Sequence, residues 1–155
     1  MLRLIPASLH RRAYRLAHTV RAHWRRIVKP QLSGCAVIAT DIEGRLLLVR
    51  LSYGSEAWSL PTGGVRRGED PERAARRELL EETGCEAHAM KLLGVQEETS
   101  FGAPNRVHVF ATRVSDTPRP DMREIIEARL FPPHSLPEPL GERTRRRLTL
   151  WRERS

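Results

Sequence analysis

The chain has 155 residues, a formal net charge of +8, 39% hydrophobic residues and two cysteines. This length fits one domain with a sizeable core. Two cysteines far apart in sequence, with no export signal, exclude a disulfide-rich secreted scaffold. We therefore expect Cys35 and Cys85 to be reduced and buried, and the protein to be cytoplasmic. No run approaches the roughly 18 apolar residues of a membrane-spanning helix, so a transmembrane segment is excluded.

The positive charge is concentrated at the N-terminus. Eight basic residues and no acidic residue precede Asp41, and the remaining 19 basic residues balance the 19 acidic ones. Apolar residues spaced by three and four over residues 8–28 predict an amphipathic helix. We accordingly divide the chain into a basic helical extension, residues 1–33, and a domain, residues 34–155. Three roles stay open for residues 1–30: a cap on the domain, a surface for anionic lipid or an RNA 5′ end, and an organelle-targeting segment.

Two short β-rich runs follow the extension. Residues 35–40 and 45–50 are mostly apolar, and the segment between them contains Gly44. This pattern predicts a β-hairpin with Gly44 in the turn.

The most informative segment is a helix predicted over residues 71–83. Asp70 is a suitable N-cap, Pro71 occupies the first helical position, and Gly84 is suited to the C-terminal cap. Glu78, Glu81 and Glu82 fall on one side of this helix, which we expect to be exposed. Like charges at this spacing repel, and a divalent cation such as Mg²⁺ would reverse that effect. The alternative is a solvated helix crossed by salt bridges.

The sequence around this helix resembles the Nudix box, G-x5-E-x7-R-E-U-x-E-E-x-G-U with U apolar. The matching residues are Gly63, Glu69, Arg77, Glu78, Leu79, Glu81, Glu82 and Gly84, with Cys85 at the last apolar position. Seven fixed identities have a chance probability on the order of 10⁻⁸ per start position. The resemblance implies an α/β fold, a Nudix-type α/β/α sandwich around a mixed β-sheet. It also implies hydrolysis of a diphosphate linkage in a nucleoside diphosphate joined to another moiety X, with Mg²⁺ or Mn²⁺.

Two further segments widen the resemblance to residues 34–135. Residues 58–64 are similar to the family's W-x-L-P-G-G lead-in, except that Thr62 replaces the first glycine. Residues 124–131 are similar to its late E-I-x-E-A-x-W-F segment, with Leu130 in place of tryptophan. Glu124 is our choice, over Asp121 and Glu127, for the extra carboxylate that many relatives place opposite the box.

The resemblance assigns roles to individual residues. The metal ligands are expected to be Glu78, Glu81, Glu82 and the backbone carbonyl of Gly63. Glu81 is also a candidate for the group that accepts the proton of water, and which carboxylate does so stays open. Arg77 is expected to orient the glutamates and Glu69 to support the turn. Tyr53 and Phe101 are candidate substrate contacts.

The rest of the chain predicts strands over residues 89–99 and 106–114, separated by a turn or longer loop over residues 100–105. Residues 115–122 are expected to form an exposed loop and a candidate substrate lid. Residues 141–154 predict a terminal helix with its arginines on a solvated face; contact with a phosphate-rich ligand is the alternative.

The sequence leaves three candidate functions, of which the first is the hydrolysis of a nucleoside diphosphate derivative and the second is a binding module. Some proteins with this fold have lost catalysis and act as nucleotide sensors or RNA-binding modules, but all four glutamates of the box are present here, which favours an enzyme. An enzyme acting on RNA 5′ ends is a third candidate. The sequence does not select one nucleoside diphosphate derivative as substrate, and it leaves a homodimer open.

Overall fold

The computed structural model describes residues 13, 16–17 and 32–155. The elements are β1 (Leu32–Thr40), β2 (Leu46–Leu51), β3 (Thr62–Gly64), α2 (Pro71–Thr83), β4 (Met90–Ser100), β5 (Ala103–Arg113), β6 (Ile125–Phe131) and α3 (Glu142–Arg154). The predicted N-terminal helix, residues 8–28, lies outside the described residues except at positions 13, 16 and 17. The three roles considered for the extension therefore stay predictions.

The strands form one mixed sheet in the order β4-β5-β1-β2-β6, with β3 paired to β1. β1 runs parallel to β5 and antiparallel to β2 and β3. The predicted hairpin is confirmed: Thr40 pairs with Leu46, and Gly44 has a φ of 77° in the turn. A left-handed backbone at this position favours glycine.

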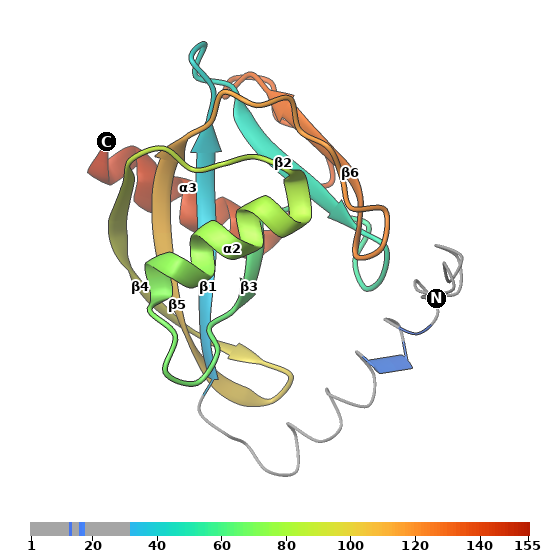
Figure 1. Cartoon of the computed structure of the whole chain (residues 1–155), viewed down its shortest axis with the longest axis vertical. Helices are drawn as coiled ribbons and strands as arrows, with labels where there is room; N and C mark the ends of the chain where they lie inside the picture. The colour runs from blue at the N-terminus through green and yellow to red at the C-terminus, as the bar shows by residue number, and fades with distance from the viewer. Residues whose placement is uncertain (1–12, 14–15, 18–31) are drawn as a thin grey trace, which may run out of the picture.

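The two helices cover opposite faces of the sheet (Figure 1), so the predicted α/β/α sandwich is confirmed. Val37 packs towards the α2 side, whereas its neighbour Ile38 packs towards the α3 side. Successive strand residues point to opposite faces, so a strand covered on both sides needs an unbroken apolar run. This explains why residues 35–39 show no polar alternation.

The connection between β4 and β5 is shorter than predicted. Only Phe101 and Gly102 separate the two strands, and their φ angles are 52° and 78°. Two positive φ angles are typical of a type I′ hairpin turn, whose twist matches that of the strands. The prediction of a loop up to Asn105 is therefore wrong, because Ala103 to Asn105 already pair with β4.

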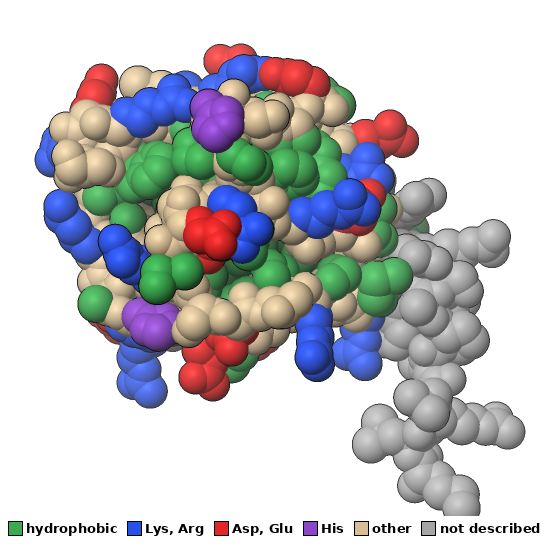
Figure 2. Space-filling view, turned by 90° about the horizontal axis from the view of Figure 1, so that it is seen from above, with side chains coloured by type: hydrophobic (Ala, Val, Ile, Leu, Met, Phe, Trp, Pro, Cys, Tyr) green, Lys and Arg blue, Asp and Glu red, His purple; other side chains and the backbone are tan. Residues whose placement is uncertain are grey.

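The state of the two cysteines and the distribution of charge on the surface agree with the expectations from the sequence. Cys35 and Cys85 are free and buried. Figure 2 shows acidic and basic side chains interspersed on the face seen from above, as the balanced charge of this part of the chain predicts. No helix among the described residues is long and apolar enough to span a membrane.

Candidate metal and substrate site

Helix α2 begins and ends where its capping residues require. The Asp70 carboxylate accepts hydrogen bonds from the backbone N–H groups of Glu72 (3.0 Å) and Arg73 (3.1 Å). Gly84 has a φ of 70° and donates its N–H to the Leu80 carbonyl. These local bonds fix where the helix begins and ends. Its rotation is fixed because Ala74, Ala75 and Leu79 pack in the core, and this rotation determines where the glutamates of the helix point.

Glu82 is buried, which corrects the expected exposed position. Its residue is only 5% exposed, and its Oε2 atom has no hydrogen-bond partner. Burial is the main reason that the pKa of Glu82 is raised well above the ordinary value, and the nearby Glu78 and Glu124 carboxylates raise it further. A hydrogen bond from the Thr62 backbone N–H acts in the opposite direction. The reason lies in the helix period: Glu82 follows Ala75 and Leu79 along the inward face. A buried carboxylate without a counter-charge is costly.

Gly63 lies directly against Glu78 of the helix. A Cβ atom on Gly63 would be only 2.0 Å from Cδ of Glu78, so no larger residue fits here without displacing that carboxylate. The Cys35 thiol contacts the Gly63 carbonyl at 3.6 Å. Burial, together with the Glu78 carboxylate, raises the pKa of Cys35 to about 12, so this thiol stays protonated.

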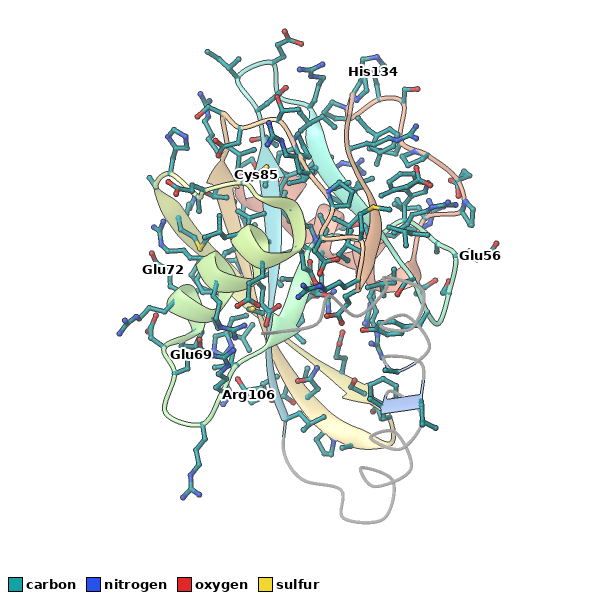
Figure 3. All side chains as sticks on the ribbon, turned by 45° about the vertical axis from the view of Figure 1, so that its right-hand side comes forward. Glu56, Glu69, Glu72, Cys85, Arg106 and His134 are labelled. Carbon is teal, nitrogen blue, oxygen red and sulfur yellow. The ribbon has the colours of Figure 1, made fainter. Side chains whose placement is uncertain are left out.

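Arg77 connects three carboxylates. Its guanidinium binds Glu69 through Nε (2.9 Å) and Nη2 (3.1 Å), donates to Glu78 Oε1 (2.6 Å) and reaches Glu81 Oε2 at 3.4 Å. The paired Arg77 lowers the pKa of Glu69 to about 2. Glu69 also accepts a hydrogen bond from the Arg66 N–H in the turn before α2. Figure 3 shows Glu69 in this turn below the helix, with Glu72 on the outer side.

Glu124 reaches the same group of carboxylates from a segment distant in sequence. It precedes β6, and its charge contributes to the raised pKa of both Glu78 and Glu82. The Tyr53 hydroxyl donates a hydrogen bond to Glu124 Oε1. Asp121 accepts the backbone N–H groups of residues 123–125 and so orders the segment that carries Glu124. The structure thus brings Glu124 next to the box glutamates, and it brings Tyr53 to Glu124.

A cleft of about 1210 Å³ opens beside these carboxylates. Gly63, Glu69 and Glu124 lie on its wall, and so do Tyr53 and Phe101, the two candidate substrate contacts. Among the described residues, none of the 115–122 loop lines the cleft. Arg119 of that loop instead donates its N–H to the Thr83 carbonyl at the end of α2, so the loop does not form the predicted lid over this cleft.

The residues fit a divalent cation. The unpaired, buried Glu82 oxygen lies among other carboxylates, and hard cations take carboxylate and carbonyl oxygens. Within residues 32–155, no three acidic, histidine or cysteine side chains already stand in ligand geometry. Glu78 is instead paired with Arg77, so an ion here would compete with Arg77 for that carboxylate.

Sequence reasoning missed one cluster on the cleft wall. The side chain of Glu98 in β4 is buried, and its Oε2 atom lies 3.0 Å from Nη2 of Arg147 in α3. Arg147 is itself 5% exposed, so the expected solvated position is wrong for this arginine. The only sequence signal was the arginine-rich run 143–147, which does not reveal a partner in a distant strand.

Comparison with known proteins agrees with this geometry. The family model described as NUDIX domain matches residues 30–151. A crystal structure of a MutT NUDIX hydrolase from Burkholderia pseudomallei is similar, with a TM-score of 0.71 and 28% identity, covering 78% of this chain and 98% of that chain.

Curated relatives match shorter stretches. An RNA pyrophosphohydrolase from Saccharophagus degradans is 44% identical over 61 residues, which cover 39% of this chain and 36% of the relative. A diphosphoinositol polyphosphate phosphohydrolase 3-alpha from Mus musculus is 33% identical over 84 residues, covering 54% of this chain and 51% of the relative. The chain thus spans about a third to a half of the length of these relatives. The family model covers most of the chain, and the chain belongs to the NUDIX domain family.

Proposed function

We propose that this protein hydrolyses a diphosphate linkage in a nucleoside diphosphate joined to another moiety X, with Mg²⁺ or Mn²⁺. The observation that carries the proposal is the buried Glu82 oxygen without a hydrogen-bond partner, close to Glu78 and to Glu124, the last of which lines the cleft. Such a carboxylate destabilises the fold and is explained if it serves to bind a cation. The hydrolase names of the relatives support the same class of reaction.

The residues divide the work as follows. Glu78, Glu82, Glu81 and the Gly63 carbonyl would hold the cation, which neutralises phosphate charge and lowers the pKa of bound water. Arg77 orients Glu78 and, through Glu69, fixes the turn between β3 and α2. Glu81, whose side chain is 55% exposed, and Glu124, which faces the cleft, are the candidates for accepting the proton of the attacking water.

Tyr53 positions Glu124 in this proposal. Tyr53→Phe is expected to lower kcat about 10-fold, because loss of a hydrogen bond to a charged group costs about 1.5–3 kcal/mol, while KM changes little. Steady-state kinetics with Mg²⁺ would measure both constants. Ser52→Ala is the control, since it removes a neighbouring side-chain hydrogen bond to the Arg123 carbonyl but keeps the Ser52 N–H bond to the Glu124 carbonyl. A rise in KM with unchanged kcat would instead indicate that Tyr53 contacts substrate.

The function is tested by product release from a substrate panel. The panel contains nucleoside triphosphates, nucleotide sugars, ADP-ribose, dinucleoside polyphosphates and triphosphorylated RNA, each with Mg²⁺, with Mn²⁺ and with a chelator. Turnover that the chelator abolishes is expected for one class. RNA belongs in the panel because of the relatives' names and the basic residues 1–30. Nucleotide binding without any turnover would favour a nucleotide sensor or RNA-binding module.

A further inference from the structure

Three arginines of α3 converge on one carboxylate of β4. The side chain of Glu98 is 5% exposed. Its carboxylate oxygens lie 3.0 Å from Nη2 of Arg147, 3.6 Å from Nη1 of Arg143 and 3.6 Å from Nη2 of Arg146. In the part of the chain that the structure describes, no second carboxylate lies within ion-pair distance of these guanidinium groups. Three positive charges therefore face one negative charge, and the cluster has an excess of positive charge.

The buried members of the cluster retain unused hydrogen-bonding groups. The Nε atom of Arg147 is buried without a partner, and so is the carbonyl Oδ1 atom of Asn105, whose amide lies 3.5 Å from Glu98. Burial lowers the pKa of Arg147, and the like charges of Arg143 and Arg146 lower it further, whereas Glu98 raises it. A network that only anchored α3 to β4 would be expected to pair its buried donors.

The backbone of α3 adds to the positive potential at the same place. Helix α3 begins at Glu142, and its N-cap residue, Gly141, provides no side-chain hydrogen bond to the first turn. Gly141, Glu142, Arg143 and Thr144 all lie on the wall of the cleft, so one carboxylate shares this end of the helix with the arginines. The N-terminus of a helix carries partial positive charge and unpaired N–H groups, which attract anions.

The cleft joins this positive region to the acidic site. Arg143, Arg147 and Glu98 line it together with Gly63 and Glu124. We propose that Arg143, Arg147 and the first turn of α3 bind a phosphate group of the substrate that lies beyond the scissile diphosphate. This inference rests on the proposed function, and it makes X, or the chain of phosphates, an anionic rather than a neutral group. Arginine suits this role because its guanidinium can bind phosphate oxygens in a bidentate manner.

Two arginines provide a matched pair of variants. Arg143 and Arg146 are about equally exposed, at 49% and 50% of their side chains, and both lie 3.6 Å from Glu98. Only Arg143 of the two lines the cleft. Arg143 also donates a hydrogen bond to the Thr99 carbonyl (2.6 Å), so loss of a structural role at Arg143 would lower the Tm. A phosphate site would instead show itself as weaker phosphate binding on loss of Arg143.

The test compares ATP, which has a third phosphate, with ADP-glucose, in which X is neutral. Arg143→Ala is expected to reduce the selectivity for ATP, measured as the ratio of kcat/KM values, about 10-fold or more, through the KM for ATP. Arg146→Ala is expected to change this ratio about twofold or less. Equal losses in the two variants, accompanied by equal losses of Tm, would overturn the proposal in favour of a structural network. An unchanged ratio in Arg143→Ala would overturn it as well.

Binding of inorganic tripolyphosphate separates this inference from the proposed function. Calorimetry with Mg²⁺ needs no turnover, so it remains informative if the protein hydrolyses neither nucleotide. Weaker binding by Arg143→Ala, with wild-type binding by Arg146→Ala, would support the phosphate site even if the hydrolase proposal failed. Equal binding by wild type and Arg143→Ala would overturn the site.

Discussion

Glu82→Gln is expected to abolish Mg²⁺-dependent turnover and, in metal-free protein, to raise the free energy of unfolding. Loss of a metal ligand removes several kcal/mol of transition-state stabilisation, which corresponds to a decrease in kcat on the order of 10³-fold. The increase in stability follows because the wild-type carboxylate is buried, unpaired and close to Glu78 and Glu124. A neutral amide removes that repulsion, and we expect about 1–3 kcal/mol, the usual cost of an unsatisfied buried polar group.

The effect of Glu82→Gln on stability should depend on pH. The pKa of Glu82 is raised in the folded state, so the folded protein binds a proton more readily than the unfolded chain. Stability from this group is fully present below the unfolded pKa and is lost as pH rises through the raised folded pKa. The difference between variant and wild type should therefore be small at low pH and grow as pH rises.

Urea denaturation in a chelator across a pH series measures this difference, and turnover with Mg²⁺ measures the other half of the prediction. Glu72→Gln is the control, because Glu72 lies on the exposed side of the same helix and pairs with Arg76. This variant should keep its activity and lose at most about 0.5 kcal/mol of stability. Retained turnover in Glu82→Gln would contradict the metal assignment. A loss of stability at high pH would contradict the burial argument.

The sequence predicted helix α2 to the residue because its signals are local. Asp70, Pro71 and Gly84 act through backbone bonds within one turn of the helix ends. The hairpin of β1 and β2 was predicted for the same reason. The burial of Glu82 was missed although a signal was present, since Ala75, Leu79 and Glu82 follow one helical stripe.

Contacts between distant segments could not be predicted in the same way. Tyr53 contacts Glu124 only because β2 pairs with β6. Glu98 contacts Arg147 only because α3 packs over β4. Spacing along the chain carries no information on either pair. The resemblance to the Nudix box supplied the candidate metal ligands, but it did not supply the cluster that we propose for phosphate binding.

Gly63→Ala is expected to disrupt the site through a single methyl group. The added Cβ would lie 2.0 Å from Cδ and 2.3 Å from Cγ of Glu78, well inside van der Waals contact. Either Glu78 changes rotamer and leaves Arg77, or β3 moves away from α2. Overpacking of this kind typically costs about 1–3 kcal/mol of stability. Displacement of a proposed metal ligand should also lower kcat with Mg²⁺ at least 100-fold, because even small misplacements of catalytic groups are costly.

Gly64→Ala is the matched control for this prediction. Gly64 is the next residue of β3, and a Cβ atom there would meet nothing within 4 Å. The variant should therefore keep its activity, and its Tm should stay close to that of the wild type. Thermal denaturation and Mg²⁺-dependent kinetics of both variants separate the two positions. Equal behaviour of the two variants would show that the close approach of Gly63 to Glu78 is not what requires glycine. A defect confined to Gly63→Ala would tie the first glycine of the box to the position of Glu78 on α2.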